Sequence, residues 1–393
     1  MSASTSCSER AHTALHALRR GEQLSNDVLR ALGEECPDEF FPIMIEALSD
    51  SFDPAQVEIY HRVMQVWIPQ ARLPVNPTSI PGQVETVYVL SRVTLGSDIK
   101  ITSAILDAMK RRFPDARIVL VGGRKSAELF AADRRIEHLE TPYPRSGPLS
   151  ARIRFARELR QQLEAPHRIV VDPDSRITQL GVVPLCEPEN YFHFPSRTAG
   201  GASAANLTEL TNSWIEQTFG VPGEAFVAPE PVPINDERPI AAVSLGVGGN
   251  LAKRVGGAFE AELIRALGSR YQTIRIDRGA GGEEALRVSK AVEASGAAGR
   301  VRFWEGSFAG FASLIAQSDF YTGYDSAGQH AAAAAGIPLI SIFAGAVSER
   351  FRDRWTPRGP ALPIVIDAAD PSPPAIMAMW LYEHRKIESR STR

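Results

Sequence analysis

The pattern whose chemistry points most directly to a ligand lies in residues 320–345. An apolar run ends at Asp325, a turn containing Gly328 follows, and an alanine-rich helix then leads into a second apolar run. A strand, turn, helix and strand in this order belong to a parallel sheet. The first N–H groups of a helix have no intrahelical partner and lie at the positive end of its dipole. We therefore expect this turn to bind an anion, with phosphate or diphosphate as the natural occupant.

The anion contacts expected in this turn come mainly from the main chain, and Gly328 would let the ligand approach it closely. Four consecutive residues would present their N–H groups: Ser326, Ala327, Gly328 and Gln329. Asp325 is expected to orient the turn, because its charge repels phosphate. His330 has two interpretations, a contact with the ligand or a packed, hydrogen-bonded role beside the helix.

A second glycine-rich loop follows another apolar strand, at residues 246–254. Its backbone N–H groups can cradle a phosphate, and Lys253 can add a positive charge beside a diphosphate oxygen. Gly248, Gly249 and Asn250 are the other candidate contacts. The alternative is a tight glycine turn with a solvated lysine.

A third glycine-rich turn precedes Glu283 and Glu284. A carboxylate at this place, for which we select Glu283, can bind ribose hydroxyls as in dinucleotide-binding folds. Glutamate is also favoured in a first helical turn by the dipole alone, so both interpretations stay open.

A polar turn, Gly96-Ser97-Asp98, lies at the carboxyl end of the strand predicted from Val84. A carboxylate there can accept the proton of a hydroxyl group while that oxygen forms a new bond. Alternatively, Asp98 caps the following helix by accepting a hydrogen bond from its first turn.

Periodicity and composition divide the chain into four parts. They are a helical extension at 1–70, a proline-rich linker at 71–83, and two α/β domains at 84–225 and 226–393. Strands alternate with helices in both domains, which predicts two open parallel sheets. Ligands bind at the carboxyl ends of strands in such sheets, so we expect the catalytic centre between the domains.

Three segments give the chain a resemblance to glycosyltransferase family 9, the ADP-heptose:lipopolysaccharide heptosyltransferases. They are residues 94–121, 244–254 and 324–345. The resemblance extends over roughly 84–357 and leaves the helical extension unexplained. One departure is that the family usually has Asp directly after Gly, whereas Ser97 intervenes here.

The resemblance implies an α/β fold of two facing Rossmann-like domains (the GT-B architecture), here with an N-terminal helical extension. It also implies a metal-independent, inverting transfer of a sugar from a nucleotide diphosphate donor, for which it suggests ADP-heptose. The donor would be a substrate, and no cofactor is implied. Asp98 would act as the base, while Lys253 and the helix start at 326–329 hold the leaving diphosphate.

Composition sets limits on the partners. Hydrophobic residues make up 44% of the 393 residues and charged residues 23%, and the formal net charge is −3. The chain therefore lacks the basic excess typical of nucleic-acid binders. The expected partners are a nucleotide-sugar donor and a glycan or glycolipid acceptor, with peripheral membrane association as a further expectation.

The location expected from the sequence is cytoplasmic, at the inner face of a membrane. The first residues lack a signal-peptide core, and no apolar run approaches membrane-spanning length. Cys7, Cys36 and Cys186 are few, odd in number and widely separated, which suits a reducing compartment and offers no zinc spacing.

The first domain carries basic side chains that would suit a phosphorylated or carboxylated acceptor. They are Arg92, Arg124, Lys125, Arg145 and Arg152, of which at least half are expected to be solvated. Asp172 and Arg176 follow a strand and are further candidate contacts to the acceptor or sugar.

Two other function classes stay open. A nucleotide-sugar epimerase would use the same fold and diphosphate loop without an acceptor, and a non-catalytic protein would bind a sugar nucleotide or glycan without turnover. A dinucleotide-dependent oxidoreductase is less favoured, because residues 246–250 lack the complete GxGxxG order.

Overall fold

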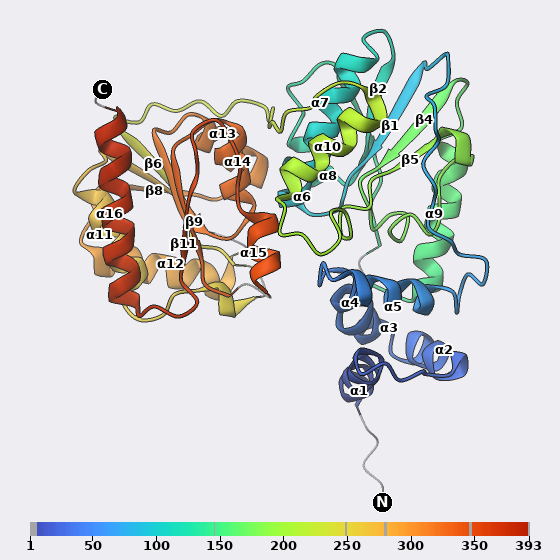
Figure 1. Ribbon diagram of the computed structural model, residues 1–393. Coiled ribbons are helices and arrows are strands. Elements are labelled where there is room, and N and C mark those ends of the chain that lie inside the picture. Colours follow the sequence, from blue (N-terminus) through green and yellow to red (C-terminus); the bar gives the residue numbers. More distant parts are fainter. Residues whose placement is uncertain (1–5, 145, 248–249, 279–280, 346–347, 392–393) are drawn as a thin grey trace, which may run out of the picture. The chain divides into compact units, whose positions relative to one another are not determined.

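Two parallel β-sheets organise the chain in the computed structural model, which describes residues 6–144, 146–247, 250–278, 281–345 and 348–391 (Figure 1). Residue contacts divide the chain into two units. Unit 1 comprises Met1–Thr94, Ile105–Arg124 and Arg135–Gly223. Unit 2 comprises Leu95–Ala104, Lys125–Arg134 and Glu224–Arg393. The predicted fold class of two parallel α/β sheets is confirmed.

The sheet of unit 1 has the strand order β3-β2-β1-β4-β5, and all its pairings are parallel. Its strands are β1 (Thr86–Leu90), β2 (Arg117–Gly122), β3 (Ile136–Glu140), β4 (Arg168–Asp172) and β5 (Tyr191–His193). The longer connecting helices are α7 (Ser103–Arg112), α9 (Leu149–Gln162) and α10 (Leu207–Phe219). Strands β1 and β4 are buried along their whole length, which explains the apolar residues at their centres.

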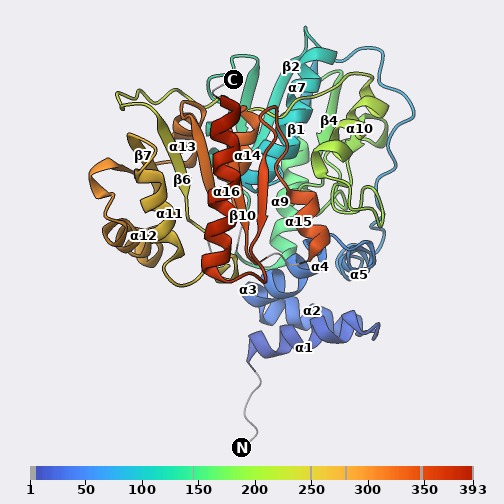
Figure 2. The ribbon, with the colours of Figure 1, turned by 60° about the vertical axis from the view of Figure 1, so that its left-hand side comes forward.

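The amino-terminal extension consists of short helices that pack against the first sheet. They are α1 (Cys7–Arg19), α2 (Asn26–Glu35), α3 (Pro37–Glu39), the π-helix η1 (Phe40–Glu46), α4 (Ala47–Ser49) and α5 (Pro54–Met64). Figures 1 and 2 show them in blue at one end of the first sheet. Phe41 and Met44 belong to the same hydrophobic core as Val121 and Val170. The extension and the first sheet therefore share one core.

A disulfide joins Cys7 to Cys36, with 5.4 Å between their Cα atoms. This corrects the expectation of reduced, unpaired cysteines. Helices α1 and α2 fold back on each other, so the first residue of α1 meets the C-cap of α2 across 29 residues of sequence. Cysteine usage therefore no longer argues for a reducing compartment. Cys186 stays a buried thiol, and its burial raises the pKa of the group to about 12.

The sheet of unit 2 has the order β11-β10-β9-β6-β7-β8. Its strands are β6 (Ile240–Ser244), β7 (Thr273–Asp277), β8 (Val301–Trp304), β9 (Phe320–Tyr324), β10 (Leu339–Phe343) and β11 (Ile364–Asp367). Its longer helices are α11 (Phe259–Gly268), α12 (Gly282–Ser295), α13 (Phe308–Ala316), α14 (Ala327–Ala334), α15 (Glu349–Trp355) and α16 (Pro373–Ser391).

The order of strands reverses direction beside β6. From β6 the chain moves outward to β7 and β8, and then returns to β9 on the other side of β6. Such a reversal opens a crevice at the carboxyl ends of the two neighbouring strands, where open α/β sheets bind ligands. The two predicted phosphate loops follow β6 and β9, so the fold brings them to this crevice. Within the described part of the chain, no helix has both the length and the apolar character that crossing a bilayer requires.

Candidate active site

The loops after β6 and β9 begin side by side, because Ser244 pairs in register with Gly323. A Cβ atom on Gly323 would lie 2.3 Å from the backbone oxygen of Ser244, so only glycine fits there. Gly345, after β10, has a similar role: a Cβ on it would lie 2.4 Å from the backbone oxygen of Ala252. Gly345 thus allows the short helix η4 (Leu251–Lys253) to approach the end of β10 closely.

Lys253 reaches from η4 to the turn after β9. Its Nζ donates to Asp325 Oδ2 at 2.7 Å and to the Asp325 carbonyl oxygen at 3.3 Å. The lysine side chain is 21% exposed and that of Asp325 is 9% exposed. The ammonium group of Lys253 therefore lies at the turn that was predicted to bind an anion, and it is paired there with the Asp325 carboxylate.

The start of α14 is fixed by side chains within the turn. Gln329 Nε2 donates to Asp325 Oδ1 at 2.6 Å, and Ser341 Oγ donates to Gln329 Oε1. Ser326 is the N-cap residue, but its side chain makes no capping hydrogen bond. The Ser326 side chain therefore does not accept a hydrogen bond from the first backbone N–H groups of α14.

Gly328 has a packing role that the sequence did not reveal. A Cβ atom on Gly328 would lie 2.2 Å from Tyr321 Oη, so the hydroxyl group occupies the space where a side chain would begin. The glycine is needed because Tyr321 of β9 packs directly against α14. Close approach of a ligand is therefore not required to explain it.

His330 is 5% exposed, and the charged groups that act on it are the side chains of Lys100 and Lys253. Burial, and then the positive charges of Lys100 and Lys253, hold the pKa of His330 well below its ordinary value. Its ring contacts Trp355 of α15 at a centroid distance of 5.8 Å, and its Nε2 lies 3.4 Å from Gln329 Nε2. The imidazole is therefore neutral near pH 7 and has one N–H to donate.

The Gly-Ser-Asp turn belongs to unit 2 by its contacts and packs on His330. A Cβ atom on Gly96 would lie 3.2 Å from His330 Cδ2. Asp98 is 1% exposed, and its Oδ1 accepts a hydrogen bond from Thr102 Oγ1 at 2.9 Å. The carboxylate thus lies inside the first helical turn and accepts from a side chain four residues ahead.

A widened helical turn follows Ser97, the residue that stands between Gly96 and Asp98 where the family usually has Asp directly after Gly. Between α6 (Leu95–Ser97) and α7, the chain forms the π-helix η2 (Asp98–Thr102). A π-helical turn holds one residue more than an α-helical turn and is frequent at functional sites. We infer that the additional residue is taken up in this wider turn, so that α7 continues without interruption.

Lys100 is a charged residue of this turn that sequence reasoning missed. It is 3% exposed, and its Nζ donates to the Thr356 carbonyl oxygen at 2.8 Å. The signal available in the sequence was its position between two apolar residues, Ile99 and Ile101, which are both buried.

The structure places Glu284, rather than Glu283, against the loop after β6. Glu284 Oε2 accepts from the backbone N–H of Val247 at 3.0 Å, whereas Glu283 is exposed on the first turn of α12. Asn250 is exposed and caps η4, its Oδ1 accepting from Ala252 N at 3.1 Å. Gly248 and Gly249 lie outside the described residues, so their predicted phosphate contacts stay predictions.

The arginines expected to form an open acceptor face are partly buried in unit 1. Arg92 is 4% exposed and Arg152 is 1% exposed. Arg176, which was expected with Asp172 to contact the acceptor or sugar, is 9% exposed and pairs with carboxylates of the extension. Arg124 is exposed, and Arg145 is outside the described residues. Arg92 and Arg152 are thus too buried to belong to an open acceptor face, whereas Arg124 and Lys125 are exposed.

Comparison with known proteins supports the fold. Neither a scan against protein-family models nor a search of curated proteins finds a match. Among solved structures, the E. coli heptosyltransferase WaaC with ADP-2-deoxy-2-fluoro heptose aligns with 76% of this chain and 99% of its own, at 17% identity and a TM-score of 0.56. E. coli ADP-heptose lipopolysaccharide heptosyltransferase II aligns with 78% and 100%, at 16% identity and a TM-score of 0.53.

A family 9 glycosyltransferase from Veillonella parvula aligns with 74% of this chain and 88% of its own, at 15% identity and a TM-score of 0.55. The resemblance to family 9 is thus confirmed as structural similarity over about three quarters of the chain. At this identity, the likeness establishes the fold.

Proposed function

We propose that the protein is a glycosyltransferase that moves a sugar from a nucleotide diphosphate donor to an acceptor hydroxyl. The observation that carries the proposal is the meeting of Lys253 with the start of α14 at the crevice between β6 and β9. Similarity to a heptosyltransferase solved with ADP supports it and suggests ADP-heptose as the donor. We place the reaction in the cytoplasm, at the periphery of a membrane if the acceptor is a glycolipid.

The leaving diphosphate would be held by charge rather than by a metal ion. The start of α14 offers N–H groups and the positive end of a helix dipole. Lys253 has three donors, of which two are used on Asp325, and the third is directed at a phosphate oxygen in this proposal. This positive charge would stabilise the diphosphate as the bond to the sugar breaks.

Asp98 is proposed as the base. As the acceptor oxygen attacks the anomeric carbon, its proton passes to the Asp98 carboxylate, and the electrons of the breaking C–O bond leave with the diphosphate. One displacement of this kind inverts the anomeric centre. The hydrogen bond from Thr102 would orient the carboxylate, and the neutral His330 would donate to the sugar or to a phosphate oxygen.

Ligand-induced stabilisation tests the donor assignment. Because a ligand that binds only the folded state raises apparent stability, ADP and ADP-sugars should raise the unfolding temperature in a dose-dependent way, and adenosine should do so less. Equal shifts with adenosine, or no shift with any of a panel of nucleoside diphosphates, would remove the proposed diphosphate site.

A second candidate, a non-catalytic sugar-nucleotide-binding protein, is favoured by one observation. Asp98 is 1% exposed, whereas a base must contact its acceptor. Such a protein would bind the donor but release no nucleoside diphosphate with any acceptor. Turnover separates the two candidates.

A further inference from the structure

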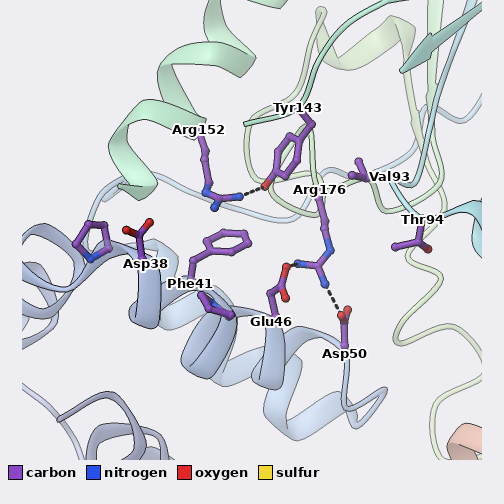
Figure 3. A pocket seen from close by; sticks show the side chains of 11 residues that line it. Asp38, Phe41, Glu46, Asp50, Val93, Thr94, Tyr143, Arg152 and Arg176 are labelled. Atoms are coloured by element: carbon purple, nitrogen blue, oxygen red, sulfur yellow. Dashed lines mark hydrogen bonds and ion pairs between the residues drawn. The ribbon is translucent and has the colours of Figure 1, made fainter. Parts of the chain in front are cut away.

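A cavity of about 450 Å³ lies in unit 1 between the extension and the first sheet (Figure 3). Its size is within the range of small-molecule sites, roughly 300–1,000 Å³. One wall comes from the extension, mainly α3 and η1 with Asp38, Phe41 and Glu46. The opposite wall comes from loops of the first sheet, so the cavity exists only because the extension is present.

The cavity lies at the reversal point of the first sheet. Strand β1 pairs with β2 on one side and β4 on the other. Thr94 follows β1 and Arg176 follows β4, while Tyr143 follows β3, and all three line the cavity. This is the edge at which open α/β sheets bind ligands.

The backbone around the cavity adopts costly conformations. Val93, which lines it, has φ 77°, an outlier for a β-branched residue, and Asp174 in the loop after β4 has φ 71°. The wall supplied by η1 is π-helical, a form frequent at functional sites. Such strain persists where the surrounding structure enforces it, and it concentrates at ligand sites.

The charges of the cavity are nearly balanced. Arg176 Nη1 donates to Glu46 Oε1 at 2.5 Å, and its Nη2 donates to Asp50 Oδ2. Asp50 Oδ1 also accepts from Arg197 Nε at 3.1 Å. Partial burial raises the pKa of Asp50, but the positive charges of Arg176, Arg197 and Arg92 outweigh this and hold the pKa below its ordinary value, so the group is a carboxylate near pH 7.

The second arginine of the cavity is held by aromatic groups. The Arg152 guanidinium lies 3.5 Å from the centroid of the Phe41 ring, and its Nη1 donates to Tyr143 Oη at 2.9 Å (Figure 3). With Asp38, which is exposed, the lining has three carboxylates and two guanidinium groups. Among the described residues that line the cavity, positive charge is therefore not in surplus over negative charge, so they do not favour a phosphate or carboxylate.

The lining suits a ring that carries hydroxyl groups. Glu46 and Asp50 keep 41% and 42% of their side chains exposed, so their oxygens can accept further hydrogen bonds. A sugar hydroxyl donates one hydrogen bond and accepts others, which matches carboxylates and guanidinium groups side by side. Tyr143 adds an aromatic surface against which the C–H face of a sugar can pack.

We propose that this cavity binds an uncharged sugar unit of the acceptor glycan, so that the extension sets acceptor choice. The assignment rests on the proposed glycosyltransferase function. It also replaces the phosphorylated or carboxylated acceptor expected from the sequence.

Binding of simple sugars to the full-length protein tests the proposal. Methyl α-D-glucopyranoside and methyl α-D-mannopyranoside are the uncharged probes, with glucose 6-phosphate, glucuronate and glucosamine as charged ones. Saturation-transfer NMR should detect at least one neutral glycoside and weaker binding of all three charged sugars. Preference for an anion or for glucosamine would overturn the proposal.

Two conservative variants locate the binding. Tyr143→Phe keeps the ring but removes the hydroxyl that holds Arg152, and Glu46→Gln keeps the shape but removes one charge. Each should weaken the neutral glycoside about tenfold, the equivalent of one hydrogen bond to a charged group. Glu46→Gln should also improve glucuronate binding, because Arg176 then has one carboxylate fewer. Glu34→Gln, an exposed position of α2, is the matched control and should bind as the wild type.

The outcome separates this proposal from the proposed function. If neutral glycosides do not bind, or bind equally to the variants and the wild type, while ADP still stabilises the protein, the acceptor assignment fails alone. If glycosides bind as predicted but no nucleoside diphosphate stabilises the protein, the donor site and the glycosyltransferase function fail instead.

Discussion

Replacing Lys253 by methionine tests how the diphosphate is held, since methionine keeps an unbranched stem and removes the charge. The lysine side chain is 21% exposed, so solvent screens its interaction with an anion in part. A hydrogen bond to a charged group contributes about 1.5–3 kcal/mol. We therefore expect Lys253→Met to weaken ADP binding roughly tenfold to a hundredfold.

The partner of Lys253 sharpens this prediction. Without the cation, the Asp325 carboxylate keeps its hydrogen bond from Gln329 but loses the positive charge that neutralises it. Its negative charge then repels the diphosphate. Adding Asp325→Asn to Lys253→Met should therefore recover part of the lost affinity, although it removes a further charged group.

Calorimetric titration with ADP and, in parallel, adenosine measures both effects. Adenosine lacks the diphosphate and should bind the variants as it binds the wild type. Lys290→Met, at an exposed position of α12, is the control for loss of a lysine. Unchanged ADP affinity in Lys253→Met, or an equal loss for adenosine, would refute the assignment. A further loss in the double variant would refute the role given to Asp325.

Three further predictions concern packing and protonation. Because the folded protein disfavours charged His330 and the unfolded chain does not, the free energy of unfolding should fall as pH drops below about 6.5, by up to about 1.4 kcal/mol per pH unit for this group. The contribution of His330 to this dependence of unfolding free energy on pH, measured by urea unfolding, should vanish in His330→Gln. An unchanged dependence in that variant would contradict the prediction. Replacing Cys36 by serine removes the bond to Cys7 and should cost roughly 2–4 kcal/mol, and urea unfolding of the wild type should show the same loss in reductant. Gly328→Ala should destabilise the protein by about 1–3 kcal/mol through its clash with Tyr321 Oη; partial recovery in a Tyr321→Phe background, seen in thermal unfolding, checks the cause.

The parallel sheets and the unit at 320–345 were predictable because local patterns determine them. The mainly apolar segments became the buried five-residue strands β6, β9 and β10, and the polar turn between β9 and α14 lies where the sequence predicted it. Asp325 was expected to orient the turn, and it accepts from Lys253 and Gln329.

What the sequence did not reveal depends on contacts between distant residues. The pairing of Cys7 with Cys36 requires the fold-back of α1 on α2, and the partners of Arg176 lie 126 and 130 residues away in the extension. Lys100 and Gly328 owe their environments to packing of one element on another, so sequence reasoning missed Lys100 and expected a ligand-facing glycine at Gly328.

The most direct test of the central claim is acceptor-dependent release of nucleoside diphosphate from a nucleotide sugar, compared between the wild type and Asp98→Asn. We predict release by the wild type together with sugar incorporated into an acceptor, and a loss of at least about a hundredfold in Asp98→Asn, in the range of general base catalysis, with ADP binding unchanged. Full transfer by Asp98→Asn would show that another group is the base. An isomerised donor, or binding without release across donors and acceptors, would contradict the assignment as a glycosyltransferase.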